Sequence, residues 1–203
     1  MAKKIKLKTP HQAEEASRLE RADAALAHAA TRHRKHPVVR VAGVVAEVAD
    51  QPPLMTLCAA TLVVGALLKQ PRLVRAGARM LASEVVATGA KAVVKRFVAR
   101  TRPGKMLEDG RYVLHHDKRG DKNEGPWNSF PSGHTAGAVA VGRALVREYP
   151  SAAPAVGLGV ALVAVIQPFI GAHFPSDVAA GAAVGLGSEA VVDAVARQID
   201  KQA

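Results

Sequence analysis

Apolar and charged positions divide most of the chain into helical segments. Two runs carry no charge, Gln51–Leu68 and Pro154–Ala172, and each approaches the roughly 20 apolar residues that cross a bilayer. Three further segments are apolar with isolated charges at helical spacing, namely Leu73–Val98, Ser132–Arg147 and Ser176–Arg197. The sequence shows neither an alternating strand pattern nor a repeat of fixed period. The pattern predicts an all-α helical bundle of about five core helices, embedded in a membrane.

Residues 1–50 are more polar, and we expect them to lie beside that bundle. They begin with a basic tail, and residues 11–35 are predicted to form a helix that is polar over most of its circumference. Val38–Asp50 is also helical in pattern, but too short and too polar to cross a bilayer. The basic run Arg32–Pro37 is either a solvated charged surface or an interfacial segment on anionic lipid. We therefore predict a basic tail with amphipathic or interfacial helices, followed by a bundle over residues 51–203.

The composition indicates how the bundle packs and what it binds. Of the 203 residues, 49% are hydrophobic but only 3% are aromatic, so the core must pack through small residues at close helix contacts. The formal net charge of +11 favours an anionic partner. The sequence has no nucleic-acid-binding motif, which favours lipid head groups or phosphorylated substrates over nucleic acid. Cys58 is the only cysteine, so an intrachain disulfide is excluded and a packing role is expected.

The charges of Leu73–Val98 indicate how this helix is oriented. At about 100° per residue, Glu84, Lys91 and Lys95 fall on one stripe. Charges in a helix that crosses a membrane usually face the bundle interior. We expect this stripe to point inward, with Glu84 and Lys91 supporting Lys95. The alternative is a soluble amphipathic helix with an ordinary charged face.

Three short stretches carry most of the residues suited to chemistry: Lys95–Pro103, Ser129–His134 and Gly171–Asp177. They supply two histidines, one carboxylate and several cations, and they lie at the ends of apolar segments, where a bundle could bring them to one level. Cations can hold a phosphate dianion while one histidine attacks phosphorus and the other protonates the leaving oxygen. Phe-Pro-Ser occurs twice before an apolar run, so Ser132 and Ser176 are predicted helix N-caps. Two helix starts at one place would form an anion site.

The connection between the first two stretches is long and polar. Residues 103–129 have no clear periodicity, and loops of this length are usually functional or disordered. Trp127 either lines a substrate path or pins the loop. His115, His116 and Asp117 look like metal ligands, but adjacent histidines rarely converge on one ion, and we predict no metal site.

The three stretches together resemble the type-2 phosphatidic acid phosphatase family of the acid phosphatase and vanadium haloperoxidase superfamily. The resemblance rests on Lys95-x6-Arg102-Pro103, on Pro131-Ser132-Gly133-His134 and on His173-x3-Asp177, and it extends over about Leu54–Gln198. The third motif departs from the family pattern, because Ile166 and Gln167 stand where the family has Ser-Arg. One phosphate-binding cation is therefore missing.

The resemblance implies a role for each motif residue. His173 would be the nucleophile, Asp177 would accept the other ring proton of His173, and His134 would be the general acid. The substrate-binding residues would be Lys95, Arg102, Ser132, Gly133 and Gln167. Gln167 can donate a hydrogen bond to a phosphoryl oxygen but carries no charge.

The resemblance also implies the function. It predicts a metal-independent phosphatase in a bacterial inner membrane, without a cofactor, that hydrolyses a lipid phosphate monoester or pyrophosphate through a phospho-histidine intermediate. The first alternative is a non-catalytic membrane protein that retains the fold and the anion pocket. The second is a vanadate-dependent haloperoxidase on the same fold. The sequence does not indicate an oligomeric state.

Overall fold

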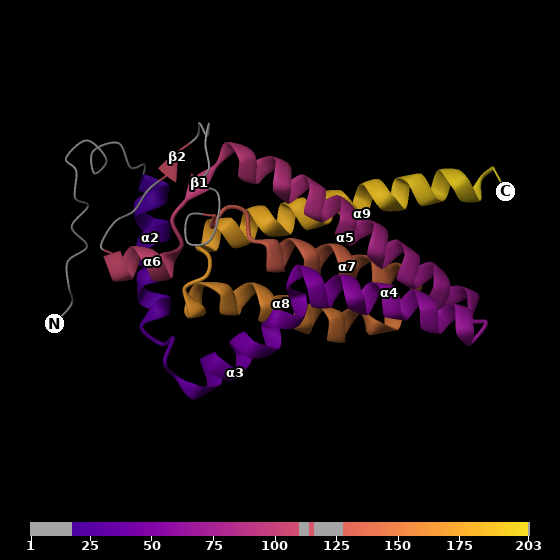
Figure 1. Cartoon of the computed structure of the whole chain (residues 1–203), viewed down its shortest axis with the longest axis horizontal. Helices are drawn as coiled ribbons and strands as arrows, with labels where there is room; N and C mark the ends of the chain where they lie inside the picture. Colours follow the sequence, from indigo (N-terminus) through magenta and orange to yellow (C-terminus); the bar gives the residue numbers. More distant parts are fainter. Residues whose placement is uncertain (1–17, 110–113, 116–127, 203) are drawn as a thin grey trace.

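The computed structural model describes residues 18–109, 114–115 and 128–202. Within them the chain is almost entirely helical (Figure 1). The α-helices are α2 (Arg18–Thr31), α3 (Pro37–Ala46), α4 (Gln51–Leu67), α5 (Pro71–Phe97), α6 (Pro103–Asp109), α7 (Gly133–Glu148), α8 (Ala153–Ile170) and α9 (Pro175–Asp200). Short 3₁₀ helices, η1 (Glu47–Ala49) and η3 (Pro150–Ala152), follow α3 and α7.

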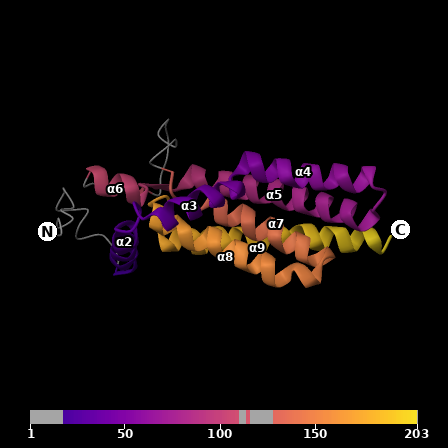
Figure 2. The same cartoon turned by 90° about the horizontal axis from the view of Figure 1, so that it is seen from below.

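Five long helices form the body of the molecule. In Figures 1 and 2, α4, α5, α7, α8 and α9 run along the long axis. Helix α5 packs against α4, α7 and α9, and α7 also contacts α8 and α9. Helix α2 lies across one end, where it contacts α6, α8 and α9, while the C-terminus lies at the other end. This arrangement confirms the predicted all-α bundle of five core helices with N-terminal helices beside it.

Small residues set the spacing between the core helices. A Cβ atom on Gly185 of α9 would lie 2.5 Å from the Ala136 carbonyl oxygen of α7, and one on Gly77 of α5 would lie 2.4 Å from the Leu62 nitrogen of α4. A larger residue at either position would push backbone away from backbone. The main apolar cluster joins α4, α5 and α7 and consists of Leu54, Cys58, Met80, Val141 and Ala144. The expected small-residue packing and the packing role of Cys58 both agree with this core.

Two helical stretches are long and apolar enough to cross a membrane, Pro150–Ile170 and Pro175–Ile199. Pro37–Ala49 and Gln51–Leu67 make a third if the two helices, which meet at a 56° bend, count as one span. Only 17% of the apolar window in Pro150–Ile170 is buried inside the molecule, and its outward side chains include Leu158, at 74% exposure. Such a surface is suited to contact with the lipid of a membrane. The chain is an integral membrane protein.

The spans differ in part from the sequence prediction. The uncharged run Gln51–Leu68 reaches spanning length only together with the bent helix before it. Pro175–Ile199 qualifies although it carries Asp177, Glu189, Asp193 and Arg197, because an 18-residue window within it has a mean hydropathy of 1.5. The division of the chain at residue 50 stays a prediction.

The connection between the first two motifs also differs from the prediction. It was expected to have no regular structure, yet Pro103, at the first helical position, begins α6. Strand β1 (Ala99–Arg100) pairs antiparallel with β2 (Leu114–His115). Strands of two residues are too short to show alternation in the sequence. His116, Asp117 and Trp127 lie outside the described residues.

Candidate active site

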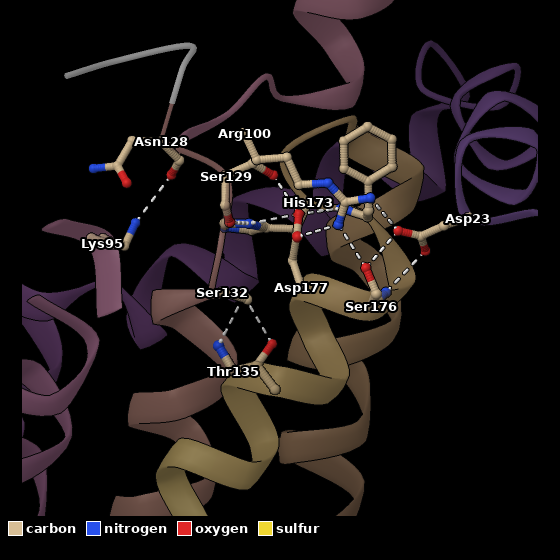
Figure 3. Close-up of polar contacts among 11 residues, drawn as sticks. Asp23, Lys95, Arg100, Asn128, Ser129, Ser132, Thr135, His173, Ser176 and Asp177 are labelled. Atoms are coloured by element: carbon tan, nitrogen blue, oxygen red, sulfur yellow. Dashed lines mark hydrogen bonds and ion pairs between the residues drawn. The ribbon is translucent and has the colours of Figure 1, made fainter. Parts of the chain in front are cut away.

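His173 lies in the turn between α8 and α9, and its ring is fixed by one short hydrogen bond. The Nδ1 atom is 2.7 Å from the backbone carbonyl oxygen of Ser129, and the residue is only 2% exposed (Figure 3). A carbonyl oxygen can only accept, so Nδ1 must carry the proton. The neutral ring therefore presents its lone pair on Nε2, the atom that a nucleophilic histidine uses.

Asp177, in the first turn of α9, binds the hydroxyl of Ser129, the residue whose carbonyl oxygen holds the His173 ring. Its Oδ1 accepts a hydrogen bond from Arg100 at 2.6 Å, and its Oδ2 accepts from the Phe174 backbone N–H at 2.8 Å and from the Ser129 hydroxyl. The same Oδ2 is 3.8 Å from Nδ1 of His173, too far for a direct hydrogen bond. The structure thus differs from the expectation, because the Ser129 carbonyl takes the ring proton while Asp177 supplies a nearby negative charge.

Arg100 is buried between two carboxylates, a role that the sequence analysis missed. Its guanidinium donates to Asp177 and Ser176 at 2.6 Å and to Asp23 of α2 at 2.5 Å, and it stacks 4.0 Å from the centre of the Phe174 ring. Asp23 also accepts the Ser176 backbone N–H at 3.0 Å. Helix α2 is therefore fastened to the start of α9 through Arg100. The only hint in the sequence was the number of cations between Lys95 and Arg102.

The starts of α7 and α9 lie side by side. Ser132 caps α7 as predicted, since its hydroxyl accepts the Thr135 N–H at 3.4 Å. The prediction for α9 was wrong, because its N-cap is Phe174 and Asp177 accepts the N-cap N–H. Ser176 lies inside the first turn instead. The Ser132 N–H donates to the Asp177 carbonyl at 3.0 Å, which joins the two helix starts directly.

His134, in the first turn of α7, faces His173. The two ring centres are 6.4 Å apart, with the rings inclined at 62°. Two histidines that face each other suit a reaction in which one ring attacks phosphorus and the other protonates the leaving oxygen. Nε2 of His134 is buried without a hydrogen-bond partner in the described part of the chain. Carboxylate oxygens of Glu47 and Asp50 lie 3.7 and 4.0 Å from it.

The two predicted phosphate-binding cations also lie at this end of the bundle. Lys95, in the last turn of α5, donates to the Asn128 carbonyl oxygen at 3.0 Å. Nε of Arg102 is buried, and among the described residues no hydrogen-bond acceptor reaches it. Lys91, one turn before Lys95, brings its ammonium to 3.3 Å from where a Cβ on Gly133 would lie. A side chain at Gly133 would therefore compete with Lys91 for the space in front of the α7 start.

The surroundings of His173 lower its pKa below the ordinary histidine value. Burial is the largest cause, because a buried ring loses the hydration that stabilises its charged form. The positive charges of Arg102 and Lys95 lower the pKa further, while Asp177 opposes them. His173 is thus neutral at neutral pH, the state in which Nε2 can attack phosphorus.

Gln167 occupies the position of the missing arginine and is fully buried, at 0% exposure. Neither its Nε2 nor its Oε1 has a hydrogen-bond partner in the described ranges, a cost of about 1–3 kcal/mol for a buried polar group. Pro168 does not end the helix, and α8 continues to Ile170. Neither nearby arginine replaces the missing one here, since Arg100 binds carboxylates and Arg96 is exposed.

The structure thus brings the three predicted motifs to one end of the bundle. Glu84 is buried, as the stripe of charges predicted, but it hydrogen-bonds to Thr88 and faces Gly137, far along α5 from Lys95. No group of three or more His, Cys, Asp or Glu residues in residues 18–109, 114–115 and 128–202 is arranged to hold a metal ion.

Comparisons with known proteins agree with this architecture. The chain is similar to the transmembrane PAP2-type phosphatidylglycerolphosphate phosphatase from Bacillus subtilis, with 21% identity, a TM-score of 0.67 and coverage of 93% of this chain and 90% of the other. It is also similar to Aquifex aeolicus LpxE, with 21% identity, a TM-score of 0.62 and coverage of 83% and 92%. A comparison with curated protein sequences found no match. The family model of the PAP2 superfamily matches residues 73–198, more than half of the sequence and all three motifs, and the chain belongs to this superfamily.

Proposed function

We propose that this protein is a metal-independent phosphatase that hydrolyses a lipid phosphate monoester or pyrophosphate. One observation carries the proposal: His173 presents Nε2 from a ring locked by Ser129, opposite His134, with cations beside it. His173 also lies between two membrane spans, in the four residues that join Ile170 to Pro175. A turn between spans lies at the level of the lipid head groups, which is where a lipid presents its phosphate.

In the first step, Nε2 of His173 attacks phosphorus and forms an N–P bond while the bond from phosphorus to the leaving oxygen breaks. His134, protonated, gives its proton to that oxygen. Lys95, Arg102, Gln167 and the start of α7 at Ser132 and Gly133 would bind the phosphoryl oxygens, where charge grows in the transition state. The attacked ring gains positive charge, and Asp177 at 3.8 Å stabilises it.

In the second step, water replaces His173 on phosphorus. His134, now neutral, takes a proton from the water as the P–O bond forms and the N–P bond breaks. Inorganic phosphate leaves, and both histidines return to their starting states. The protein would act in a bacterial inner membrane, with its apolar helices α8 and α9 facing lipid beside the substrate's chains.

The test uses the purified full-length chain in detergent. Release of phosphate is measured with EDTA on phosphatidate, phosphatidylglycerol phosphate and polyprenyl mono- and diphosphate. We expect turnover that EDTA leaves intact, and a phospho-histidine that is trapped by rapid acid-free quenching and absent in His173→Ala. Loss of activity with EDTA, restored by Mg²⁺ or Zn²⁺, would overturn the proposal.

Two other outcomes correspond to the alternative functions. No turnover of any of the four substrates, with phosphate still bound, would indicate a non-catalytic protein in which Gln167 no longer supports the reaction. Bromide oxidation with added vanadate would indicate a haloperoxidase.

A further inference from the structure

A second basic cavity opens next to the phosphoryl site. Its volume is about 570 Å³, and its walls come from the α2–α3 turn, α3, the start of α6 and the end of α8. Its charged lining residues are Arg34, Arg40, Arg102, Lys105 and Glu108. The other lining residues include Gly171 and Ala172, which directly precede His173. The cavity and the nucleophile therefore share one turn of the chain.

Backbone contacts fix the position of this cavity. The Gly104 N–H donates to the Gly171 carbonyl oxygen at 2.8 Å, so the start of α6 is tied to the turn that carries His173. Gly171 has a φ of +78°, a conformation that favours glycine, and a Cβ there would lie 3.2 Å from the Gly104 backbone. Arg102 and Lys105, on either side of Gly104, are thereby held at the cavity wall.

The charges of the cavity are unbalanced. Among the described lining residues, three arginines, Arg34, Arg40 and Arg102, face one carboxylate, Glu108. Glu108 pairs with Arg34 at 3.6 Å, with both side chains about half exposed. Such an exposed ion pair contributes little stability, so Arg34 can readily bind another anion in place of Glu108. Arg102 belongs to both regions, because it lines the cavity and its charge also lowers the pKa of His173. Its buried Nε lacks a hydrogen-bond acceptor within the described residues.

We propose that this cavity binds a second anionic group of the substrate. That group is joined to the phosphoryl group that His173 attacks by a bridging oxygen or by a short linker such as glycerol. The proposal rests on the proposed function, and it narrows the substrate to lipids with two adjacent anionic centres. A lipid diphosphate and a lipid whose head group carries a phosphodiester beside the terminal phosphate share this chemistry. Phosphatidate and prenyl monophosphates lack it. Arg34 and Arg40 bind the second group, and Arg102 bridges it to the reacting one.

Turnover tests the proposal with matched substrates. For farnesyl diphosphate against farnesyl monophosphate, the double variant Arg34→Ala/Arg40→Ala should lower kcat/KM for the diphosphate at least about 10-fold and change the monophosphate less than about 3-fold. The same comparison of phosphatidylglycerol phosphate with phosphatidate, with matched acyl chains, tests whether the second anion is the phosphodiester of a lipid head group. Arg32→Ala/Lys35→Ala is the control, because both residues are exposed cations of the same turn outside the cavity lining.

A binding measurement keeps the proposal testable if the protein turns over none of these lipids. The full-length protein in detergent is titrated with inorganic pyrophosphate and with inorganic phosphate. The wild type should bind pyrophosphate at least about 10-fold more tightly, and Arg34→Ala/Arg40→Ala should remove that preference while leaving phosphate affinity unchanged. Equal losses for both anions, or the same loss in the control variant, would overturn the proposal, because the cations would then act only as a general positive field.

Discussion

The two ends of the bundle use the same kinds of charged residue in opposite ways. At the end with the C-terminus, arginines of α5, α7 and α9 are paired with carboxylates across the helices. The pairs are Arg75–Glu148 at 3.3 Å, Arg79–Glu148 at 3.2 Å, Arg79–Asp193 at 3.0 Å, Arg143–Glu189 at 2.9 Å, Arg147–Glu189 at 2.8 Å, Arg147–Asp193 at 3.2 Å and, within α9, Arg197–Asp193 at 2.5 Å. Each carboxylate meets at least two arginines, so the network is satisfied by the protein itself.

At the other end, buried polar atoms are left without partners. They include Nε2 of His134, Nε of Arg102 and both amide atoms of Gln167, as far as the described residues go. Burying polar atoms without partners is costly, so such a group is expected where a ligand completes the hydrogen bonds. Arg100 at this end resembles the distant network, since it is closed between Asp23 and Asp177. Charge pairing, rather than charge itself, therefore distinguishes the structural cluster at one end of this bundle from the candidate binding site at the other.

The largest expected effect comes from removing the nucleophile. His173→Ala should lower kcat/KM on a lipid phosphate by at least about 10⁴-fold, because no covalent intermediate can form. Glu189→Gln, in the paired network, should change kcat/KM by less than about 3-fold. Both variants are measured in the same detergent after gel filtration. A His173→Ala protein that retains more than a hundredth of the activity would remove this residue from the mechanism.

The next effect concerns stability. Arg100→Ala leaves the buried carboxylates of Asp23 and Asp177 facing each other, and breaking a buried pair in this way costs about 3–5 kcal/mol. Arg197→Ala removes a side chain that is 62% exposed and should cost no more than about 1 kcal/mol. Denaturant unfolding in mild detergent measures both. Equal losses would mean that the two ends do not differ in how their ion pairs are buried.

A smaller effect is expected from restoring the missing cation. Gln167→Arg places a charge among the unpartnered groups and should raise kcat/KM about 10-fold, or about 1.4 kcal/mol of transition-state stabilisation. The gain should disappear in Gln167→Arg/His173→Ala. If the wild type is already fast and Gln167→Arg leaves kcat/KM unchanged, the buried amide of Gln167 suffices for catalysis.

The smallest effect is on the pH profile. Burial above all, and then the charges of Arg102 and Lys95, disfavour the charged form of His173, so its folded-state pKa is lowered and the neutral nucleophile persists to lower pH. Activity should therefore fall only as the pH drops through that lowered value. Lys95→Gln removes one of the causes, so the pKa rises and the acidic limb of kcat/KM should move to higher pH. The same substrate is used for the wild type and the variant, so the titration of the substrate's own phosphate cancels. As a control, Arg143→Gln, in the paired network, should leave the acidic limb of kcat/KM in place.

The sequence predicted the helices well where apolar residues recur at helical spacing. It predicted α5 and α7 to within two residues, because a helix needs only local hydrogen bonds and one apolar face. It also placed the three motifs at one level, since helices of similar length in a bundle bring their ends together. It missed the span Pro175–Ile199, where three carboxylates and one arginine interrupt the apolar pattern, and it missed α6, which is too short to show a period.

The sequence by itself determined which reactive groups this protein has and that they meet, because motif spacing and helix length fix both. Only the tertiary structure decided which partner each group takes. Ser129 rather than Asp177 receives the His173 proton, and Arg100 joins Asp23, which lies 77 residues earlier in the chain, to Asp177. Hydrogen bonds depend on tenths of an ångström and on angle, and those are set when α2, α5, α7 and α9 pack together.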